Sequence, residues 1–264
     1  MTNWIEIDTK AKKWLQEAGE KIRRSFEESL DIQTKSNPND LVTNMDKDIE
    51  RFFIQKIKQS FPDHLILAEE GFGDKLQTLD GVVWIIDPID GTMNFIYQQR
   101  NFAISIGIYE NGIGRLGYIY DVVHDELYFA EKGKGAFLNG KPLKKLTPVK
   151  LEEAIIALNA TWLVSNKRMD PKPFISLAKT VRGTRSYGTA ALELAYVASG
   201  RLDGYITLRL SPWDFAGGKI LVEETGGIVT NLKGEPLNLL GQNTVFVAKP
   251  GLHREMMERF FKEL

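Results

Sequence analysis

The pattern of apolar and polar side chains along this chain switches between helical spacing and short continuous apolar runs. Apolar residues recur every three or four positions between residues 4 and 30, which predicts a long amphipathic helix. A second helix is predicted from about residue 46 to 59, with Thr43 or Asn44 as its cap. Between these helices, residues 31–43 hold an Asn-Pro-Asn-Asp turn flanked by two short extended pieces.

Continuous apolar runs predict the strands. The run at residues 82–86 is typical of a strand covered on both faces, and we expect it to stop at Asp87-Pro88. Residues 102–109 and 116–120 flank Asn111-Gly112, which indicates a hairpin. Further strands are expected at residues 65–68, 127–130, 154–158, 204–208, 227–231 and 244–248, and further helices at residues 171–180, 189–199, 214–225 and 252–261. Helices and sheets alternate in layers, so the fold class is α/β or α+β with two sheets.

Charge and apolar content describe an ordinary globular protein. Of the 264 residues, 43% are hydrophobic, and 34 basic residues face 35 acidic ones. A net charge of −1 gives no electrostatic reason to expect a nucleic acid or a membrane surface as partner. The first residues lack the pattern of a signal peptide, and no apolar run approaches membrane-spanning length. We therefore expect a soluble cytoplasmic protein.

The types of side chain present limit the metals that the chain can bind. It has no cysteine, so disulfides, thiolate ligands and a cysteine nucleophile are excluded. Its three histidines, His64, His124 and His253, are far apart and unsuited to a zinc pair. Any metal must bind to carboxylates and carbonyl groups, which favours Mg²⁺, Mn²⁺ or Ca²⁺.

Acidic residues follow apolar elements in three places: Glu69-Glu70, the segment Asp87-Pro88-Ile89-Asp90-Gly91-Thr92, and Trp213-Asp214. In the middle segment, Pro88 fixes the backbone direction, so Asp87 and Asp90 can point into one small volume. Two such carboxylates raise each other's pKa, and a divalent cation removes that conflict. Glycine lets a phosphate approach the backbone, and free amides suit an anion. A site with carboxylates that can bind a metal ion, beside backbone amides that can bind a phosphate, indicates an enzyme of phosphoryl transfer.

Each segment taken alone has a simpler interpretation. Asp-Pro-x-Asp-Gly is also a common turn. The pair Glu69-Glu70 suits a solvated strand end, and Asp214 suits the cap of a helix. An EF-hand fits less well, because no acid stands at position 89 and no glutamate closes the loop twelve residues along. The functional interpretation therefore depends on the three segments occurring together.

Two longer stretches carry a resemblance to a known family. Residues 84–95 (WIIDPIDGTMNF) and 213–227 (WDFAGGKILVEETGG) resemble the two signature motifs of the inositol monophosphatases. The order of the smaller blocks also matches: Lys35-Ser36, Asp40-Leu41-Val42-Thr43, Asp46, Glu69-Glu70, DPIDGT, Gly188-Thr189-Ala190-Ala191 and WD. The resemblance extends from residue 4 to the end of the chain. Related phosphatases of sugar bisphosphates, histidinol phosphate and phosphoadenosine phosphate share this pattern.

The resemblance implies a fold and a metal site. The fold would be a layered α-β-α-β-α sandwich, with one phosphatase domain made of two lobes at about residues 1–145 and 146–264. Two or three Mg²⁺ ions are implied, with Mn²⁺ as a substitute and Ca²⁺ and Li⁺ as inhibitors. The implied ligands are Glu69, Asp87 and the Ile89 carbonyl for the first ion, Asp87, Asp90 and Asp214 for the second, and Glu69 through water for a third.

The resemblance also implies roles in catalysis. Thr92, hydrogen-bonded to Asp46, would help to orient and deprotonate the attacking water, with Glu69 as a further catalytic group. The attack would be direct and in line, without a phosphoenzyme. Phosphate would bind to the amides of Gly91 and Thr92, and Lys35 would close over the site. Gly188, Ala190, Thr207 and Asp214 would contact the substrate, and the family is commonly dimeric.

One position departs from the family. Six residues before the Trp-Asp motif, inositol monophosphatases usually have a glutamate that binds the ring hydroxyls, whereas this chain has Thr207. Inositol 1-phosphate is the leading substrate, and the alternative is a broader phosphatase of sugar phosphates, fructose 1,6-bisphosphate or NADP-like nucleotides. Arg209 is either a contact for a second negative group or a solvated strand residue. Two alternatives of other classes are a non-catalytic binding or regulatory protein and a calcium-binding structural module.

Overall fold

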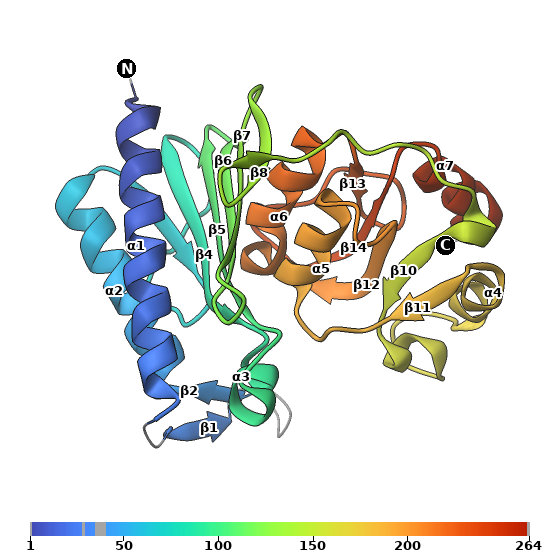
Figure 1. Ribbon diagram of the computed structural model, residues 1–264, viewed down its shortest axis with the longest axis horizontal. Coiled ribbons are helices and arrows are strands. Elements are labelled where there is room, and N and C mark those ends of the chain that lie inside the picture. Colours follow the sequence, from blue (N-terminus) through green and yellow to red (C-terminus); the bar gives the residue numbers. More distant parts are fainter. Residues whose placement is uncertain (1, 28–29, 35–40, 263–264) are drawn as a thin grey trace.

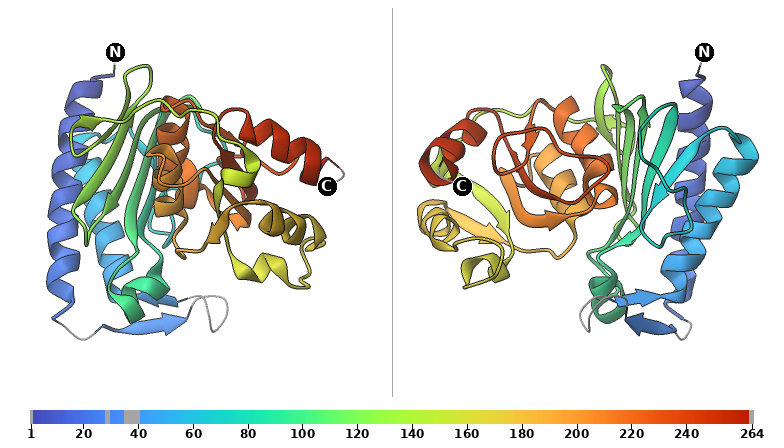
Figure 2. Two further views of the ribbon diagram at one scale, coloured as in Figure 1. Left: turned by 45° about the vertical axis from the view of Figure 1, so that its right-hand side comes forward. Right: turned by 180° about the vertical axis from the view of Figure 1, so that it is seen from behind.

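The computed structural model describes residues 2–27, 30–34 and 41–262, and these residues form five layers (Figure 1). Two helices pack on the outer face of a seven-stranded sheet, two more lie between this sheet and a five-stranded sheet, and a further two cover the outside of the second sheet (Figure 2). In this order the helices are α1 (Trp4–Ser25) and α2 (Asn44–Ser60); α5 (Ala190–Ala198) and α6 (Pro212–Glu224); and α4 (Lys172–Thr180) and α7 (Leu252–Met256), which continues into a π-helical turn at Met257–Phe261. The predicted α-β-α-β-α sandwich is confirmed.

The first sheet has the strand order β3-β4-β5-β6-β7-β8-β9. Its strands are β3 (Leu65–Ala68), β4 (Val82–Asp90), β5 (Ala103–Glu110), β6 (Ile113–Asp121), β7 (Glu126–Glu131), β8 (Gly135–Leu138) and β9 (Lys141–Pro142). Only β3 and β4 are parallel, and the strands β5 and β6 form the predicted hairpin. The short helix α3 (Thr92–Gln98) follows β4 directly.

The second sheet has the order β11-β10-β12-β14-β13 and mixes parallel with antiparallel pairs. Its strands are β10 (Ile155–Leu158), β11 (Gly183–Arg185), β12 (Gly204–Leu210), β13 (Ile228–Thr230) and β14 (Asn243–Ala248). A separate antiparallel pair, β1 (Ile32–Thr34) and β2 (Leu41–Thr43), joins α1 to α2. Short 3₁₀ turns lie at Leu151–Glu153 and Ala160–Leu163.

Helix α6 lies close to the first sheet because glycines face each other at the contact. A Cβ atom at Gly107 of β5 would come within 2.8 Å of Ala216, and one at Gly217 would come within 2.8 Å of the Ile106 and Tyr118 carbonyl oxygens. The Ser105 hydroxyl also donates a hydrogen bond to the carbonyl of Trp213 at 3.1 Å. These contacts fix the first turn of α6 beside the end of β4.

Two element ends differ from the prediction. Helix α1 ends at Ser25 rather than near residue 30, because the ring of Phe26 turns into a cluster with Phe95 and Phe102. Helix α6 begins at Pro212 rather than near residue 214, with Ser211 as its N-cap, and Asp214 in the first turn completes a capping box by accepting the Ser211 N–H. Within the described part of the chain, no helix is long and apolar enough to cross a membrane.

Candidate active site

Strand β4 carries two of the predicted carboxylates on either side of a bulge. Asp87 pairs with Ser105 and Asp90 pairs with Ala103, so β4 advances three residues while β5 advances two. Pro88 lies in this bulge, where the missing N–H removes no hydrogen bond of the ladder. The strand was expected to stop at Asp87-Pro88, and this was wrong, because β4 continues through the bulge to Asp90. The N–H of Ile89 donates to the Asp87 carboxylate at 3.0 Å, which fixes that side chain inside the bulge.

The third carboxylate comes from the first turn of α6. Asp214 accepts a hydrogen bond from the backbone N–H of Ser211 at 2.7 Å. One oxygen from each of Asp87, Asp90 and Asp214 lies within 4.8 Å of the other two. Residues more than 120 positions apart in the sequence thus form one cluster, as the family resemblance implied.

The electrostatics of the cluster suit a bound cation. Burial raises the pKa of Asp87 well above its ordinary value, and the nearby charges of Glu69, Asp90 and Asp214 raise it further. Burial also raises the pKa of Asp90 to about 7, and burial together with the charges of Asp90 and Glu69 raises the pKa of Asp214. A hard divalent cation offsets this repulsion, and carboxylate oxygens are the ligands that Mg²⁺ prefers. The donor set therefore fits Mg²⁺.

Glu69 lies beside this cluster at the end of β3. Ala68 pairs with Ile86 of the parallel neighbour β4, so the next residue of each strand, Glu69 and Asp87, lie side by side. The negative charge of Glu69 therefore acts directly on Asp87 and adds to the rise in its pKa. The turn after Glu69 is held by Glu50 of α2, whose buried carboxylate accepts the N–H of Glu70 at 2.6 Å. Sequence reasoning missed Glu50, although an acid on the apolar face of α2 was a visible signal.

Thr92 and Asp46 meet as the resemblance implied. The Thr92 hydroxyl lies 3.1 Å from one Asp46 carboxylate oxygen and 3.3 Å from the Ile89 carbonyl oxygen. The other Asp46 oxygen accepts hydrogen bonds from the backbone N–H and the hydroxyl of Thr43 at 2.8 and 2.6 Å. Burial raises the pKa of Asp46. Thr43, one of the two expected caps, thus caps α2 and orients Asp46 toward Thr92.

Gly91 links β4 to α3 in a left-handed backbone conformation, with φ of +94°. A Cβ atom there would lie 3.2 Å from both the Asn101 carbonyl oxygen and the Thr189 side chain. Glycine is therefore required at this position by both backbone conformation and space.

A pocket of about 230 Å³ adjoins the cluster. Its lining includes Asp90 and Asp214 of the carboxylate cluster. The expected substrate contacts Gly188, Ala190 and Thr207 also line it. The other residues of the lining are Asn159, Trp162, Ser186, Thr189, Glu193, Tyr205, Ile206 and Leu210. Arg209, in contrast, is exposed and is not part of this lining, which supports its interpretation as a solvated strand residue. Lys35 lies outside the described residues.

The start of α5 holds Asp90 in place. The Thr189 hydroxyl and the backbone N–H of Ala191, the latter at 2.7 Å, both donate to the same Asp90 oxygen. These two donors partly offset the effect of burial on the pKa of Asp90. Sequence reasoning did not assign this role to Thr189, because the contact joins residues almost one hundred positions apart.

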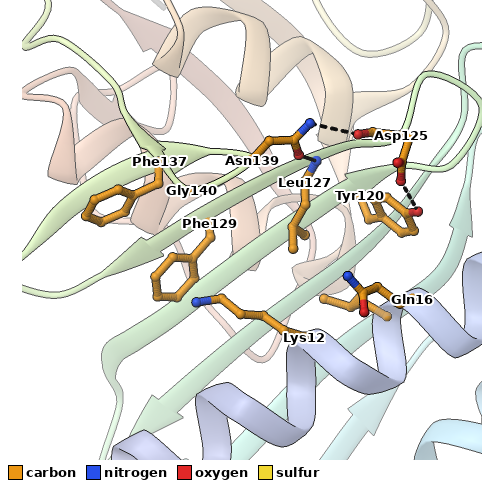
Figure 3. Close-up of a pocket in the computed structure, with 10 residues that line it drawn as sticks. Lys12, Gln16, Tyr120, Asp125, Leu127, Phe129, Phe137, Asn139 and Gly140 are labelled. Carbon is orange, nitrogen blue, oxygen red and sulfur yellow. Dashed lines mark hydrogen bonds between the residues drawn. The ribbon is translucent and has the colours of Figure 1, made fainter.

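A larger hollow of about 610 Å³ lies between α1 and the strands β6 to β8 (Figure 3). The Lys12 ammonium lies 3.6 Å from the centre of the Phe129 ring, and the Tyr120 hydroxyl donates to Asp125 at 2.6 Å. The residues lining this hollow include none of the predicted site residues. The smaller pocket, which contains the carboxylates, is therefore the candidate active site.

This layered fold has a buried carboxylate cluster next to a threonine–aspartate pair and a pocket. Together these features define a metal-dependent phosphatase. The model of the inositol monophosphatase family matches residues 3–264. The chain belongs to the inositol monophosphatase family, and it is an enzyme that hydrolyses phosphate monoesters. The non-catalytic and calcium-module alternatives are thereby set aside.

Individual relatives agree with this assignment. The chain is 59% identical over 260 residues to an inositol-1-monophosphatase of Bacillus subtilis, covering 98% of each chain. It is similar to the inositol monophosphate-bound structure of SaIMPase-II, with a TM-score of 0.88 and 41% identity. The match covers 97% of this chain and 94% of the SaIMPase-II chain. It is also similar to the structure of an IMPase/NADP phosphatase complexed with NADP and Ca²⁺, with a TM-score of 0.90 and 31% identity. That match covers 98% of this chain and 96% of the other chain.

Proposed function

We propose that this enzyme hydrolyses inositol 1-phosphate to inositol and phosphate with Mg²⁺ as its cofactor. The observation that carries the proposal is the convergence of Asp87, Asp90 and Asp214 beside a pocket and next to the Thr92–Asp46 pair. The Bacillus subtilis relative is an inositol-1-monophosphatase, and SaIMPase-II has been solved with inositol monophosphate bound.

The acidic residues have distinct roles in this proposal. Glu69, Asp87 and the Ile89 carbonyl would hold a first Mg²⁺, while Asp87, Asp90 and Asp214 would hold a second. Glu69 would hold a third, looser ion through water. When bound, Mg²⁺ supplies positive charge to the phosphate and lowers the pKa of a coordinated water. Buried carboxylates that repel one another without a cation are well suited to hold these ions.

Thr92 and Asp46 position the attacking water. Because the Thr92 hydroxyl donates its hydrogen to Asp46, its oxygen is free to accept a hydrogen bond from the water. Burial raises the pKa of Asp46, which makes this carboxylate a better proton acceptor than an exposed aspartate. The backbone amides of Gly91 and Thr92 bind the phosphate, and Lys35 closes over it. The water then attacks phosphorus in line with the leaving oxygen.

The pocket favours a broad choice of leaving group. Thr207 lines it where the family usually has a charged glutamate, so a substrate with a second anionic group meets less repulsion. Sugar phosphates, fructose 1,6-bisphosphate and NADP-like nucleotides are therefore the second candidate substrates, and one similar structure holds NADP. Phosphate release from a panel of phosphorylated polyols, sugars and nucleotides, with and without Mg²⁺, tests the proposal. The absence of Mg²⁺-dependent release from inositol 1-phosphate would overturn it.

The proposal also covers the choice of metal ion, the oligomeric state and the location of the enzyme. Mn²⁺ replaces Mg²⁺ in supporting activity, whereas Ca²⁺ and Li⁺ inhibit. The enzyme acts as a homodimer in the cytoplasm. Sedimentation equilibrium at assay concentrations measures the oligomeric state, and a monomer mass would contradict the dimer.

A further inference from the structure

A buried glutamate of α2, Glu50, binds the turn that follows Glu69. The exposed fraction of Glu50 is 0%. One of its carboxylate oxygens accepts the backbone N–H of Glu70 at 2.6 Å, and the other accepts the backbone N–H of Phe72 at 2.9 Å. The guanidinium carbon of Arg51, the next residue of α2, lies 4.2 Å from the centre of the Phe72 ring. Helix α2 therefore holds this turn through its backbone and through one of its side chains.

A carboxylate at this position of α2 is not explained by packing. Glu50 lies among the buried residues of the helix, which include Ile49, Phe53 and Ile57. A buried carboxylate is unfavourable unless hydrogen bonds satisfy its oxygens, and an apolar side chain would fill the same space without that cost. Hydrogen bonds to a carboxylate are also stronger than those between neutral groups. The two N–H groups of the turn therefore give this buried acid a role.

The shape of the turn brings both N–H groups to the same side chain. Gly71, between the two donors, has φ of +83°, a left-handed conformation that suits glycine. The far end of the loop is also bound to α2, because Asp74 accepts the ammonium of Lys58 at 2.9 Å and the backbone N–H of Ile66 at 2.9 Å. Glu69 thus lies between the end of β3 and a backbone segment fixed by α2.

The same face of α2 also holds Asp46. Asp46 lies four residues before Glu50, so the two side chains are neighbours on one face of the helix, and both have an exposed fraction of 0%. Asp46 accepts the Thr92 hydroxyl, while Glu50 accepts the turn after Glu69. One helix face therefore fixes both the threonine–aspartate pair and the segment that carries Glu69.

We propose that Glu50 is a positioning residue for Mg²⁺: by holding the N–H groups of Glu70 and Phe72, it keeps the Glu69 carboxylate beside Asp87 and so strengthens binding of the first ion. The inference rests on the proposed function, in which Glu69 and Asp87 hold that ion. Groups that orient a metal ligand without touching the metal commonly change metal affinity about ten- to a hundredfold when they are replaced. Glu50 acts on metal binding in this way, through the backbone of the turn.

The test measures Mg²⁺ binding without substrate, by isothermal titration calorimetry of the metal-free protein with MgCl₂. Glu50→Gln keeps the size of the side chain, but one end of an amide is a donor, so it can accept only one of the two N–H groups. The dissociation constant of Mg²⁺ should therefore rise about tenfold or more. The Mg²⁺ concentration needed for half-maximal phosphate release should rise with it.

Glu224 provides a matched control, because it makes the same kind of contact away from the site pocket. Its carboxylate accepts the backbone N–H groups of Gly133 and Gly135, each at 2.9 Å, in the turn between β7 and β8. Glu224→Gln should lower the melting temperature of the metal-free protein, as Glu50→Gln does, but leave the dissociation constant of Mg²⁺ unchanged. The comparison separates positioning of a metal ligand from general stability.

A second pair of variants changes the same two turns without touching either glutamate. Gly71→Ala strains the left-handed backbone, although no heavy atom lies within 4 Å of the added Cβ, and it should also weaken Mg²⁺ binding. Gly133→Ala is its control, since Gly133 has φ of +78° and equally open surroundings. Gly133→Ala should bind Mg²⁺ as the wild type does. If Glu50→Gln does not fold, this pair decides the question.

The outcomes separate the positioning role from the proposed function. An unchanged dissociation constant in folded Glu50→Gln, or in Gly71→Ala, would overturn the positioning role, and so would an equal rise in Glu224→Gln. Glu69→Gln is the reference for loss of the ligand itself and should weaken Mg²⁺ binding more than Glu50→Gln. If Glu69→Gln binds Mg²⁺ as tightly as the wild type, the proposed metal ligands are overturned and the positioning role with them. Weak binding by Glu69→Gln together with wild-type binding by Glu50→Gln would overturn the positioning role alone.

Discussion

The Thr92 hydroxyl lies 3.1 Å from an Asp46 carboxylate oxygen, although the two residues are 46 positions apart in the sequence. Thr92 begins α3, just after the bulged strand that carries Asp87 and Asp90, while Asp46 lies in the first turn of α2. The pair therefore connects the carboxylate cluster to a second helix, and it places a proton acceptor next to the proposed position of the water.

Replacing Thr92 by alanine tests this pair. Thr92→Ala removes the hydroxyl that orients the water but keeps the backbone amide, so kcat should fall by about a hundredfold or more while KM changes little. Steady-state kinetics on inositol 1-phosphate measure both constants, and Thr92→Ser is the control that retains a hydroxyl. A raised KM with an unchanged kcat would assign Thr92 to substrate binding alone.

Lithium should inhibit uncompetitively with respect to substrate. The ion is expected to enter the position formed by Asp87, Asp90 and Asp214 after turnover and to trap phosphate there. Because it then acts on the product complex, additional substrate cannot relieve the inhibition. Initial rates across a grid of Li⁺ and substrate concentrations distinguish the patterns, and purely competitive inhibition would contradict trapping.

Thr207→Glu should shift the choice of substrate toward inositol 1-phosphate. An ionised glutamate makes stronger hydrogen bonds to ring hydroxyls than threonine does, a difference of about 1–3 kcal/mol, or roughly tenfold to a hundredfold in kcat/KM. The measurement is the kcat/KM ratio between inositol 1-phosphate and a sugar or nucleotide bisphosphate. If the ratio does not move, the departure at position 207 has no effect on specificity.

Mg²⁺ should stabilise the folded enzyme against heat. Its binding to the native carboxylate cluster and not to the unfolded chain contributes about 2.7 kcal/mol at a hundredfold excess over the dissociation constant. The melting temperature should therefore rise by several degrees on adding Mg²⁺ and return on adding EDTA. A melting temperature that does not respond to Mg²⁺ would show that the cluster binds no ion in the native state.

The sequence was most informative where chemistry is concentrated in short motifs. The two motifs identified Asp87, Asp90 and Asp214, and the alternation of apolar runs and helical spacing predicted the layered fold. The bulge in β4 could not be predicted, because it depends on the pairing of β4 with β5. The predicted division into lobes at about residue 145 stays a prediction.

The residues that sequence reasoning missed act through tertiary contacts. Glu50 holds the turn after Glu69 from another helix, and Thr189 holds Asp90 from the start of α5. None of these positions has a sequence neighbour that reveals its partner. Their roles follow from the folded arrangement rather than from local spacing.

The most direct test of the account is Asp87→Asn, because Asp87 is the proposed ligand of both principal ions. Removing one buried negative charge from a repulsive cluster should leave the metal-free protein at least as stable as the wild type. Asp80→Asn, at an exposed aspartate outside the site pocket, is the matched control.

The measurement is the Mg²⁺-dependent rate of phosphate release from inositol 1-phosphate, taken together with the melting temperature of each variant. We expect Asp87→Asn to fold normally but to lose about a hundredfold or more in kcat and most of its thermal response to Mg²⁺, while Asp80→Asn behaves as wild type. Wild-type turnover by a folded Asp87→Asn enzyme would contradict the account.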